Sequence, residues 1–270
     1  METIDRLSIN QYTARQWNNH QLLEGCALAG IPFVGLWRDK LTETGLKETR
    51  NLLRATGVRV SSLCRGGFFP ARNREQQSKV LEDNRRAVDQ AAALGTEVLV
   101  LVCGGIVNGG IAHSRRMVEE GISKLLPYAI ETGVKLGIEP LHPMFAADRS
   151  VIVSLREANL IAESFNSPSL GVVIDVYHVW WDPEIYSEIR RTARRIYGFH
   201  VNDWIVPLPD TVNGRGMMGD GVIELRRLRQ AVDKEGYNGP IEVEIFNEKI
   251  WQMPGQELLT LIKKRFLRFV

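Results

Sequence analysis

The stretches LGVVIDVYH (170–178) and IYGFHVND (196–203) decide the fold. Both are short apolar runs of the kind that forms a buried strand, and they carry the reactive side chains of Asp175 and His200. Between them, Pro183 stands where a proline suits the first turn of a helix. These residues therefore predict a strand, a helix and a second strand in succession.

The same alternation runs along the whole chain. Apolar runs bounded by turn residues are followed by segments with apolar residues at three- and four-residue spacing, such as Asn73–Leu94 and Val222–Glu235. Glycines precede several of the runs, as expected where a helix ends and a strand begins. The predicted strands are Arg6–Asn10, Pro32–Trp37, Val58–Cys64, Val98–Cys103, Lys135–Glu139, Leu170–Asp175, Tyr197–Val201 and Ile241–Phe246.

Eight strand–helix units in 270 residues, with no linker between them, predict an α/β fold, a single-domain (β/α)8 TIM barrel over residues 1–270. A doubly wound open sheet is the main competitor. It usually has fewer units, and no GxGxxG motif opens a predicted helix here. Barrels of this kind build their sites at the carboxyl ends of the strands, so the residues at those ends decide the chemistry.

Composition and charge exclude several classes of protein. The chain has 34 Lys and Arg against 32 Asp and Glu, a net charge of +2, whereas nucleic-acid binders usually show a basic excess. No apolar run reaches the roughly 18 residues that span a bilayer, and the N-terminus does not read as a secretory signal. Cys26, Cys64 and Cys103 fit neither a disulfide framework nor a zinc-binding CxxC spacing. We expect a cytoplasmic protein that binds neither nucleic acid nor membrane.

Four successive predicted strands carry potential metal ligands at their ends: Glu139, Asp175, His200 and Glu244. Glu242 points to the same general side as Glu244 because strand side chains alternate, but Glu244 is nearer the carboxyl end. Each residue alone has an ordinary explanation as a solvated carboxylate, a helix cap or a buried histidine. Three carboxylates and one imidazole together suit one divalent cation, with Mn²⁺ the first choice, followed by Mg²⁺, Co²⁺ or Zn²⁺.

The motifs at these strand ends resemble those of the xylose isomerase-like TIM barrels, the sugar phosphate isomerase/epimerase superfamily. They are GIEPLHP (137–143), GVVIDVYH (171–178), GFHVND (198–203) and the closing stretch from GDG to IEVEIFNE (219–248). The resemblance covers essentially the whole chain. It implies that Glu139, Asp175, His200 and Glu244 hold the metal and that His178 contacts substrate.

The resemblance also implies a reaction, the divalent-metal-dependent isomerisation or epimerisation of a sugar or keto-sugar. The metal would polarise a carbonyl and stabilise the enediolate formed when a proton is removed next to it. Glu139 and Glu244 would flank the substrate, one removing the proton and the other returning it on the opposite face. These two glutamates are therefore the predicted catalytic residues.

Some positions depart from the patterns of this superfamily. Ketose 3-epimerases usually carry a second glutamate where this chain has Phe145, and an arginine where it has Val206. Both losses count against a free ketose as substrate. Endonuclease IV-type members need more histidines for three zinc ions than the five present here, and the near-neutral charge also disfavours DNA.

His142 is a further candidate acid–base residue. Prolines at 140 and 143 hold its backbone extended, and its ordinary interpretation is a histidine that orients the loop. The stretch EPLHPMFAADR (139–149) also resembles the catalytic subunits of C-glycoside deglycosidases, lyases that act on 3-oxo-glycosides with a small partner subunit. In that interpretation His142 would be the base. The same residues are also compatible with a dehydroshikimate-type dehydratase and with a catalytically inactive sugar-binding barrel.

Other strand ends offer residues that could bind a small sugar substrate. Trp37 presents an indole face for the apolar side of a ring, and Arg65 suits a carboxylate or a pair of hydroxyls. Arg215 lies in the glycine-rich segment Asn213–Met218, which we expect to be a mobile lid that brings this arginine to the substrate. Whether the chain forms a homo-oligomer or pairs with a small partner subunit stays open.

Overall fold

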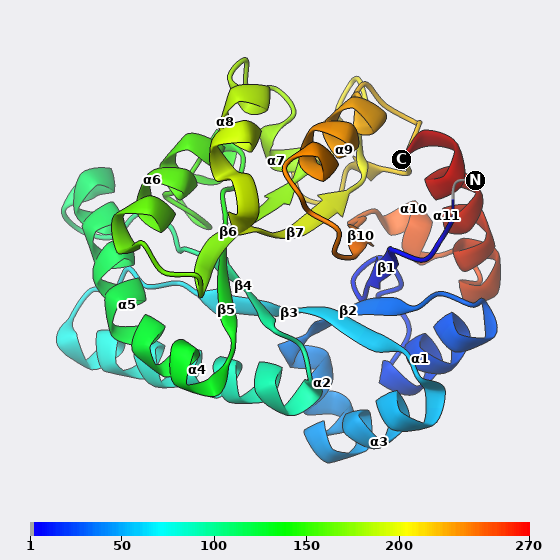
Figure 1. Ribbon diagram of the computed structural model, residues 1–270, viewed down its shortest axis with the longest axis horizontal. Coiled ribbons are helices and arrows are strands. Elements are labelled where there is room, and N and C mark those ends of the chain that lie inside the picture. The colour runs from blue at the N-terminus through cyan, green and yellow to red at the C-terminus, as the bar shows by residue number, and fades with distance from the viewer. Residues whose placement is uncertain (1–2) are drawn as a thin grey trace.

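The computed structural model describes residues 3–270 and shows a closed barrel of parallel strands inside a ring of helices (Figure 1). The order of strands around the barrel is β1-β10-β7-β6-β5-β4-β3-β2, and β8 and β9 form a separate two-stranded sheet. The predicted (β/α)8 TIM barrel is confirmed. The predicted domain started at residue 1, and residues 1–2 lie outside the described part of the chain.

The elements follow the predicted alternation. The barrel strands are β1 Leu7–Asn10, β2 Phe33–Trp37, β3 Arg59–Gly67, β4 Val98–Val102, β5 Lys135–Glu139, β6 Leu170–Asp175, β7 Ile196–Val201 and β10 Ile241–Val243; the small sheet pairs β8 Asp203–Trp204 with β9 Arg215–Gly216. The helices are α1 Asn19–Leu28, α2 Arg38–Thr44, α3 Leu46–Thr56, α4 Arg74–Leu94, α5 Gly110–Thr132, α6 Leu155–Phe165, α7 Val176–Val179, α8 Ile185–Thr192, α9 Leu225–Lys234, α10 Glu248–Trp251 and α11 Gly255–Phe269, with 3-10 turns η1 Pro143–Phe145 and η2 Ala193–Arg195. Over residues 3–270, no helix is both long and apolar enough to cross a membrane.

Six strands differ from their predicted bounds, four of them by one residue at one end. The two larger differences are in the third and the last strand of the barrel. The third runs on to Gly67, because its pairing with β4 continues beyond a register irregularity. The last ends at Val243 instead of Phe246. Beyond that point the backbone N–H of Ile245 donates to the hydroxyl of Thr13 at 2.8 Å, so the chain leaves the ladder of strands.

Side chains of the barrel strands point alternately toward the surrounding helices and into the barrel interior, since successive residues of a strand face opposite sides. The face toward the helices forms the main core, which includes the fully buried Leu36, Leu63, Leu99 and Ile138. The barrel interior holds a smaller apolar cluster of Cys64, Val98, Val100 and Val173. The rest of the barrel interior is filled by polar side chains, which extend as far as the carboxyl ends of the strands.

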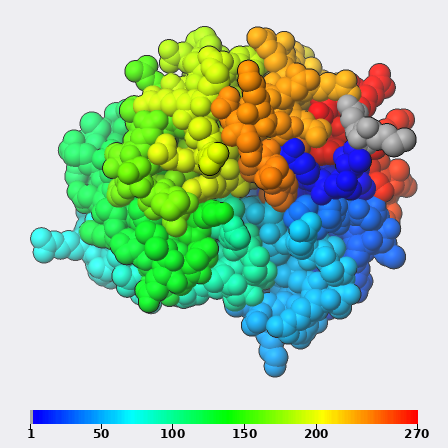
Figure 2. Space-filling view, viewed as in Figure 1, coloured from blue at the N-terminus to red at the C-terminus, as the bar shows by residue number. Residues whose placement is uncertain are grey.

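The two ends of the chain meet where the barrel closes. β1 pairs with β10, with Leu7 opposite Ile241. Figure 1 shows α11 beside the N-terminal segments, and in Figure 2 the red C-terminal segments lie against the blue N-terminal ones. Contacts between α1 and α11 complete the helical layer at this seam.

Asp203 organises the long connection between β7 and α9. Its buried carboxylate accepts hydrogen bonds from the backbone N–H groups of Gly219 (2.8 Å) and Ile223 (3.0 Å). Because Asp203→Ala removes the partner of the buried N–H of Ile223 and of the N–H of Gly219, we expect it to lower the free energy of unfolding by about 1–3 kcal/mol in urea titrations. Asp210→Ala, which removes an exposed carboxylate that caps a turn of the same connection, is the control and should have a much smaller effect. Equal stability of the two variants would contradict the prediction.

Candidate metal centre

The four predicted metal ligands meet at the carboxyl ends of their strands. Glu139 and Asp175 are the last residues of β5 and β6, His200 lies in β7 and Glu244 follows β10. Each offers one ligand atom, and these atoms all lie within 4.8 Å of one another. Asp175 and His200 stand opposite each other in the register of β6 and β7, so the barrel backbone itself places them.

His200 is the centre of this cluster. Its Nδ1 lies 3.1 Å from Glu244 Oε2 and 3.5 Å from Glu139 Oε1. All four side chains are buried, with Glu139 the most exposed at 5%. Charged groups are rarely buried unless they are paired or bind an ion, so the cluster is an unusual feature of the molecule.

Arg215 belongs to the cluster rather than to a loose lid. It is 7% exposed, and β9 is held against β8. Its guanidinium lies 2.8 Å from Asp175 Oδ2 and 3.3 Å from Glu244 Oε2, between the rings of Tyr177 and Phe246. The expectation of a mobile lid is therefore wrong for this part of the segment, because ion pairs and burial hold Arg215 in place.

His178 lies beside Arg215. Its Nε2 is 3.3 Å from Arg215 Nη2 and 3.7 Å from Asp175 Oδ2, and its Nδ1 accepts a hydrogen bond from the backbone N–H of His142 at 3.2 Å. Burial lowers the pKa of His178 to about 3, although the carboxylate of Asp175 acts in the opposite direction. His178 is thus a neutral imidazole next to the cluster.

The side chain of His142 is not brought to the cluster. Its Nδ1 accepts the backbone N–H of Met144 at 3.2 Å, and its ring packs against Trp181 and Trp204. It is absent from the lining of the cavity above the cluster. The structure therefore differs from the expectation that His142 projects toward substrate, because its ring packs against two tryptophans at the start of the 3-10 turn η1. The backbone of His142 instead orients His178.

A cavity of about 250 Å³ opens above the cluster. It is lined by Glu139 and Glu244 together with all the predicted substrate-binding residues: Trp37, Arg65, His178 and Arg215. The Trp37 ring stacks on Tyr12 with centroids 4.1 Å apart, and the guanidinium of Arg65 lies 5.5 Å from the Trp37 ring. The cavity therefore has an aromatic wall and a cationic wall above a carboxylate floor.

The sequence profile of the family described as xylose isomerase-like TIM barrel matches residues 23–268. The chain belongs to this family. Among solved structures, protein SMc04130 from Sinorhizobium meliloti 1021 is 44% identical, with a TM-score of 0.96 and coverage of 99% of both chains. The IOLI protein, solved with a zinc atom bound, is 18% identical with a TM-score of 0.86 over 98% of both chains, and this likeness shows the fold alone.

Two curated relatives of this xylose isomerase-like barrel are enzymes. A 3-dehydroshikimate dehydratase of Pseudomonas putida is 25% identical over 244 residues, which is 87% of this chain and 37% of the relative. The L-ribulose-5-phosphate 3-epimerase UlaE of Escherichia coli O1:K1 / APEC is 25% identical over 204 residues, 73% of this chain and 68% of the relative. The chain thus spans little more than a third of the length of the dehydratase that it matches.

The electrostatics of the barrel mouth fit a divalent cation. Burial raises the pKa of Glu139 to about 7; the hydrogen bond to His200 acts against this rise and the nearby charge of Glu244 adds to it. Burial disfavours protonated His200, but Glu242, Glu139 and Glu244 outweigh it and hold the pKa of His200 well above its usual range. A histidine must be neutral to bind a metal. With His200 neutral, three carboxylate ligands beside one guanidinium leave two negative charges, which one divalent ion would balance. Oxygen and nitrogen donors without sulfur suit such an ion.

Two residues that orient Asp175, Asn202 and Tyr177, were not predicted from the sequence. Its Oδ1 accepts hydrogen bonds from Asn202 Nδ2 and from the backbone N–H of Tyr177, both at 2.9 Å. The second bond caps helix α7, so Asp175 is a helix cap and a member of the cluster at once. The signal for Asn202 was its position two residues after His200, which places both side chains on the same face of the chain.

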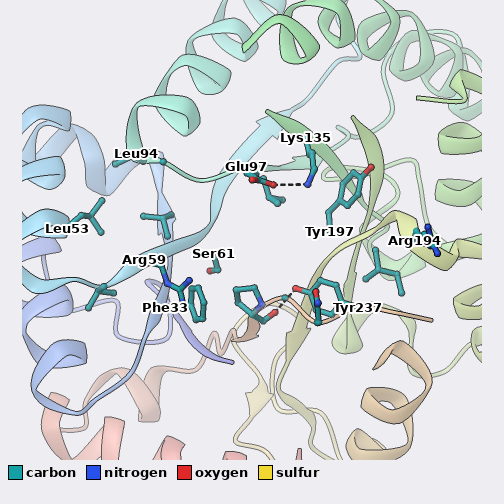
Figure 3. A pocket seen from close by; sticks show the side chains of 18 of the residues that line it. Phe33, Leu53, Arg59, Ser61, Leu94, Glu97, Lys135, Arg194, Tyr197 and Tyr237 are labelled. Atoms are coloured by element: carbon teal, nitrogen blue, oxygen red, sulfur yellow. Dashed lines mark hydrogen bonds and ion pairs between the residues drawn. The ribbon is translucent and has the colours of Figure 1, made fainter. Parts of the chain in front are cut away.

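A second and larger cavity, of about 920 Å³, lies at the other end of the barrel (Figure 3). Its lining includes Phe33, Arg59, Ser61, Lys135, Tyr197 and Tyr237. In Figure 3 Lys135 and Glu97 point toward one another, and their ion pair spans 2.7 Å. None of the four predicted metal ligands lines this cavity, so its size does not mark it as the site of the reaction.

Proposed function

We propose that this xylose isomerase-like barrel is a divalent-metal-dependent isomerase or epimerase of a sugar or keto-sugar. The observation that carries the proposal is the buried set of Glu139, Asp175, His200 and Glu244 at the floor of the cavity. The family, and the likeness to a sugar phosphate epimerase, support a sugar as the substrate class.

Glu139 and Glu244 are the proposed acid–base residues. Both line the cavity, so both can reach a substrate held there. One would remove the proton from the carbon next to the carbonyl, and the other would return a proton on the opposite face. Both carboxylates are buried, and the exclusion of water strengthens their electrostatic interactions with a bound substrate.

The cavity walls are proposed to hold the sugar. The indole of Trp37 would pack on the apolar face of the ring, while Arg65 and Arg215 would donate to its oxygens. His178 is proposed to donate one hydrogen bond through Nε2, since its pKa keeps it neutral and its Nδ1 already accepts the backbone N–H of His142. Ketose 3-epimerases carry an arginine at the position of Val206, which is 65% exposed in this chain. In this chain the arginine beside the proposed metal ligands is Arg215 instead.

The proposed cofactor is one Mn²⁺ ion, with Mg²⁺, Co²⁺ and Zn²⁺ as the ions to compare. Glu139, Asp175, His200 and Glu244 would hold it. When bound it would supply a Lewis acid that polarises the substrate carbonyl. The zinc atom of the IOLI protein makes Zn²⁺ the first comparison.

A dehydratase of a cyclic keto acid is the second candidate function. The match to a 3-dehydroshikimate dehydratase over 87% of this chain favours it, and that reaction would also begin with proton removal next to a carbonyl. The lyase function has weaker support, because it assigns the base to His142, whose ring lies outside the cavity. A homo-oligomer or a small partner subunit stays a prediction.

Incubation in D₂O with free ketoses, 3-oxo-glycosides and 3-dehydroshikimate tests the proposed function. We expect deuterium to enter the carbon next to the carbonyl of a sugar without loss of any group, as measured by NMR and mass spectrometry. Release of the aglycone would indicate the lyase, and loss of water from 3-dehydroshikimate would indicate the dehydratase. No exchange with any of the three substrate classes would contradict all the enzymatic proposals.

A further inference from the structure

Glu242 is a buried carboxylate that the four-residue cluster does not include. It lies in β10 opposite His200 of β7 and is 2% exposed. Strand alternation directs Glu242 and Glu244 to the same side at different heights, so Glu242 sits one layer deeper in the barrel. A carboxylate in this position needs partners, because an unpaired buried charge is strongly destabilising.

Three uncharged donors hold the Glu242 carboxylate in place. Asn10 Nδ2 donates to Oε1 at 2.7 Å, and the hydroxyls of Ser61 and Ser62 donate to Oε2 at 2.8 and 3.0 Å. Gly35 leaves the room for it, since a Cβ at that position would stand 1.9 Å from Oε1. Strands β1, β2 and β3 therefore all contribute residues that accommodate this carboxylate.

The two ring nitrogens of His200 face different carboxylates. Nδ1 faces the ligand carboxylates of Glu139 and Glu244. Nε2 faces Glu242, with its Oε2 at 3.7 Å, and is a buried nitrogen with no hydrogen-bond partner. Glu242 thus lies on the opposite side of the imidazole from Glu139 and Glu244, and it is not one of the proposed metal ligands.

We infer that Glu242 is a positioning residue for the metal centre. It attracts the Nε2–H of His200, which fixes the tautomer whose Nδ1 carries the free lone pair and points into the cluster. Histidines that bind metals generally donate their second N–H to a carboxylate or a carbonyl, and removing that partner typically lowers metal affinity 10–100-fold. The inference rests on the proposed metal centre and adds a residue that acts through His200.

The same network reaches the wall of the substrate cavity. Asn10, which donates to Glu242, accepts the indole N–H of Trp37 through Oδ1 at 2.9 Å. At its other end Ser61 lines the larger cavity, where Figure 3 labels it. Glu242 therefore links Trp37, the proposed sugar-binding residue, with His200, the proposed metal ligand, through one network of polar contacts.

Glu242→Gln tests the inference, because glutamine keeps the volume and removes the charge. We expect the dissociation constant for Co²⁺ and Zn²⁺, measured by calorimetry on the full chain without substrate, to rise about 10–100-fold. In ¹⁵N NMR of the Zn²⁺-loaded protein, His200 should carry its proton on Nε2 in the wild type. In the variant the ¹H resonance of this Nε2–H should shift upfield, because a neutral amide attracts the N–H less than a carboxylate does.

Glu188→Gln is the matched control. Glu188 is a buried carboxylate of α8 that accepts a hydrogen bond from Asn159 at 2.9 Å, away from the cluster. Its replacement should leave the metal dissociation constant unchanged. An unchanged dissociation constant and an unchanged Nε2–H resonance in Glu242→Gln would overturn the inference.

Two further outcomes separate this inference from the proposed function. A wild-type chain that binds no divalent metal would overturn the metal centre itself. A wild-type chain that binds Zn²⁺ with the proton of His200 on Nδ1 would overturn the role of Glu242 alone. This last measurement needs no variant, so it can overturn the inference even if Glu242→Gln does not fold.

Discussion

Replacing Glu139 by glutamine is expected to abolish exchange of the substrate proton with solvent. A positioned general base contributes typically 10²–10⁴-fold to a rate, and Glu139 is in addition one of the four clustered donors. We therefore expect turnover in Glu139→Gln to fall at least about a thousand-fold. The measurement is the rate of deuterium incorporation in D₂O, with the circular dichroism spectrum as the check that the fold is kept.

Two controls make the Glu139 result specific. Glu97→Gln removes an exposed carboxylate that pairs with Lys135 at the opposite end of the barrel, and it should leave turnover unchanged. Elemental analysis of Glu139→Gln separates its two roles: a variant that keeps its metal but loses exchange has lost the base. Unchanged turnover would exclude Glu139 as an essential residue.

Removing the metal is expected to abolish activity and to destabilise the protein. The carboxylates of Glu139, Asp175 and Glu244 lie within 4.8 Å of one another, so without the metal only Arg215 and His200 offset their mutual repulsion in a buried space. Dialysis against a chelator should stop turnover, and Mn²⁺ should restore it. A ligand present at a thousand times its dissociation constant adds about 4 kcal/mol to the free energy of unfolding, which thermal or urea unfolding would detect.

Variants test whether the stabilisation comes from the cluster. Asp175→Asn should lose the added stability from Mn²⁺, whereas Asp210→Asn, which changes an exposed turn, should keep it. Elemental analysis of the wild type purified without chelator should give one metal per chain. Protein that contains no metal and gains no stability from added Mn²⁺ would contradict the role of the four residues.

The strand ends were predictable because their geometry follows from local pattern. Side chains alternate along a strand, and parallel strands closed into a barrel present their carboxyl ends at one mouth. Asp175 and His200 could therefore be placed near each other from their positions in two neighbouring strands. The predicted strand ends at Cys64 and Phe246 were less accurate. Pairing with β4 carries the third strand on to Gly67, and the last strand stops early where the N–H of Ile245 bonds to the distant Thr13.

The loop residues were not predictable in the same way. His142 and Arg215 both lie outside the barrel strands, where no repeating pattern sets the direction of a side chain. The turn at Pro143 and the two neighbouring tryptophans direct His142 away from the cavity. Ion pairs with Asp175 and Glu244, about 30 to 40 positions away in the chain, draw Arg215 into the centre.

The amino-acid sequence by itself determined the barrel and the four residues that meet at its mouth, since both follow from the spacing of apolar and charged residues along strands. Only the tertiary structure decided that Arg215 joins them, that His142 turns away and that Glu242 faces the back of His200. The physical reason is that these three placements depend on contacts between residues far apart in the chain. A buried charge or a loop side chain interacts with whatever residues lie near it in the folded barrel. These residues can be distant in the chain, so sequence spacing does not reveal them.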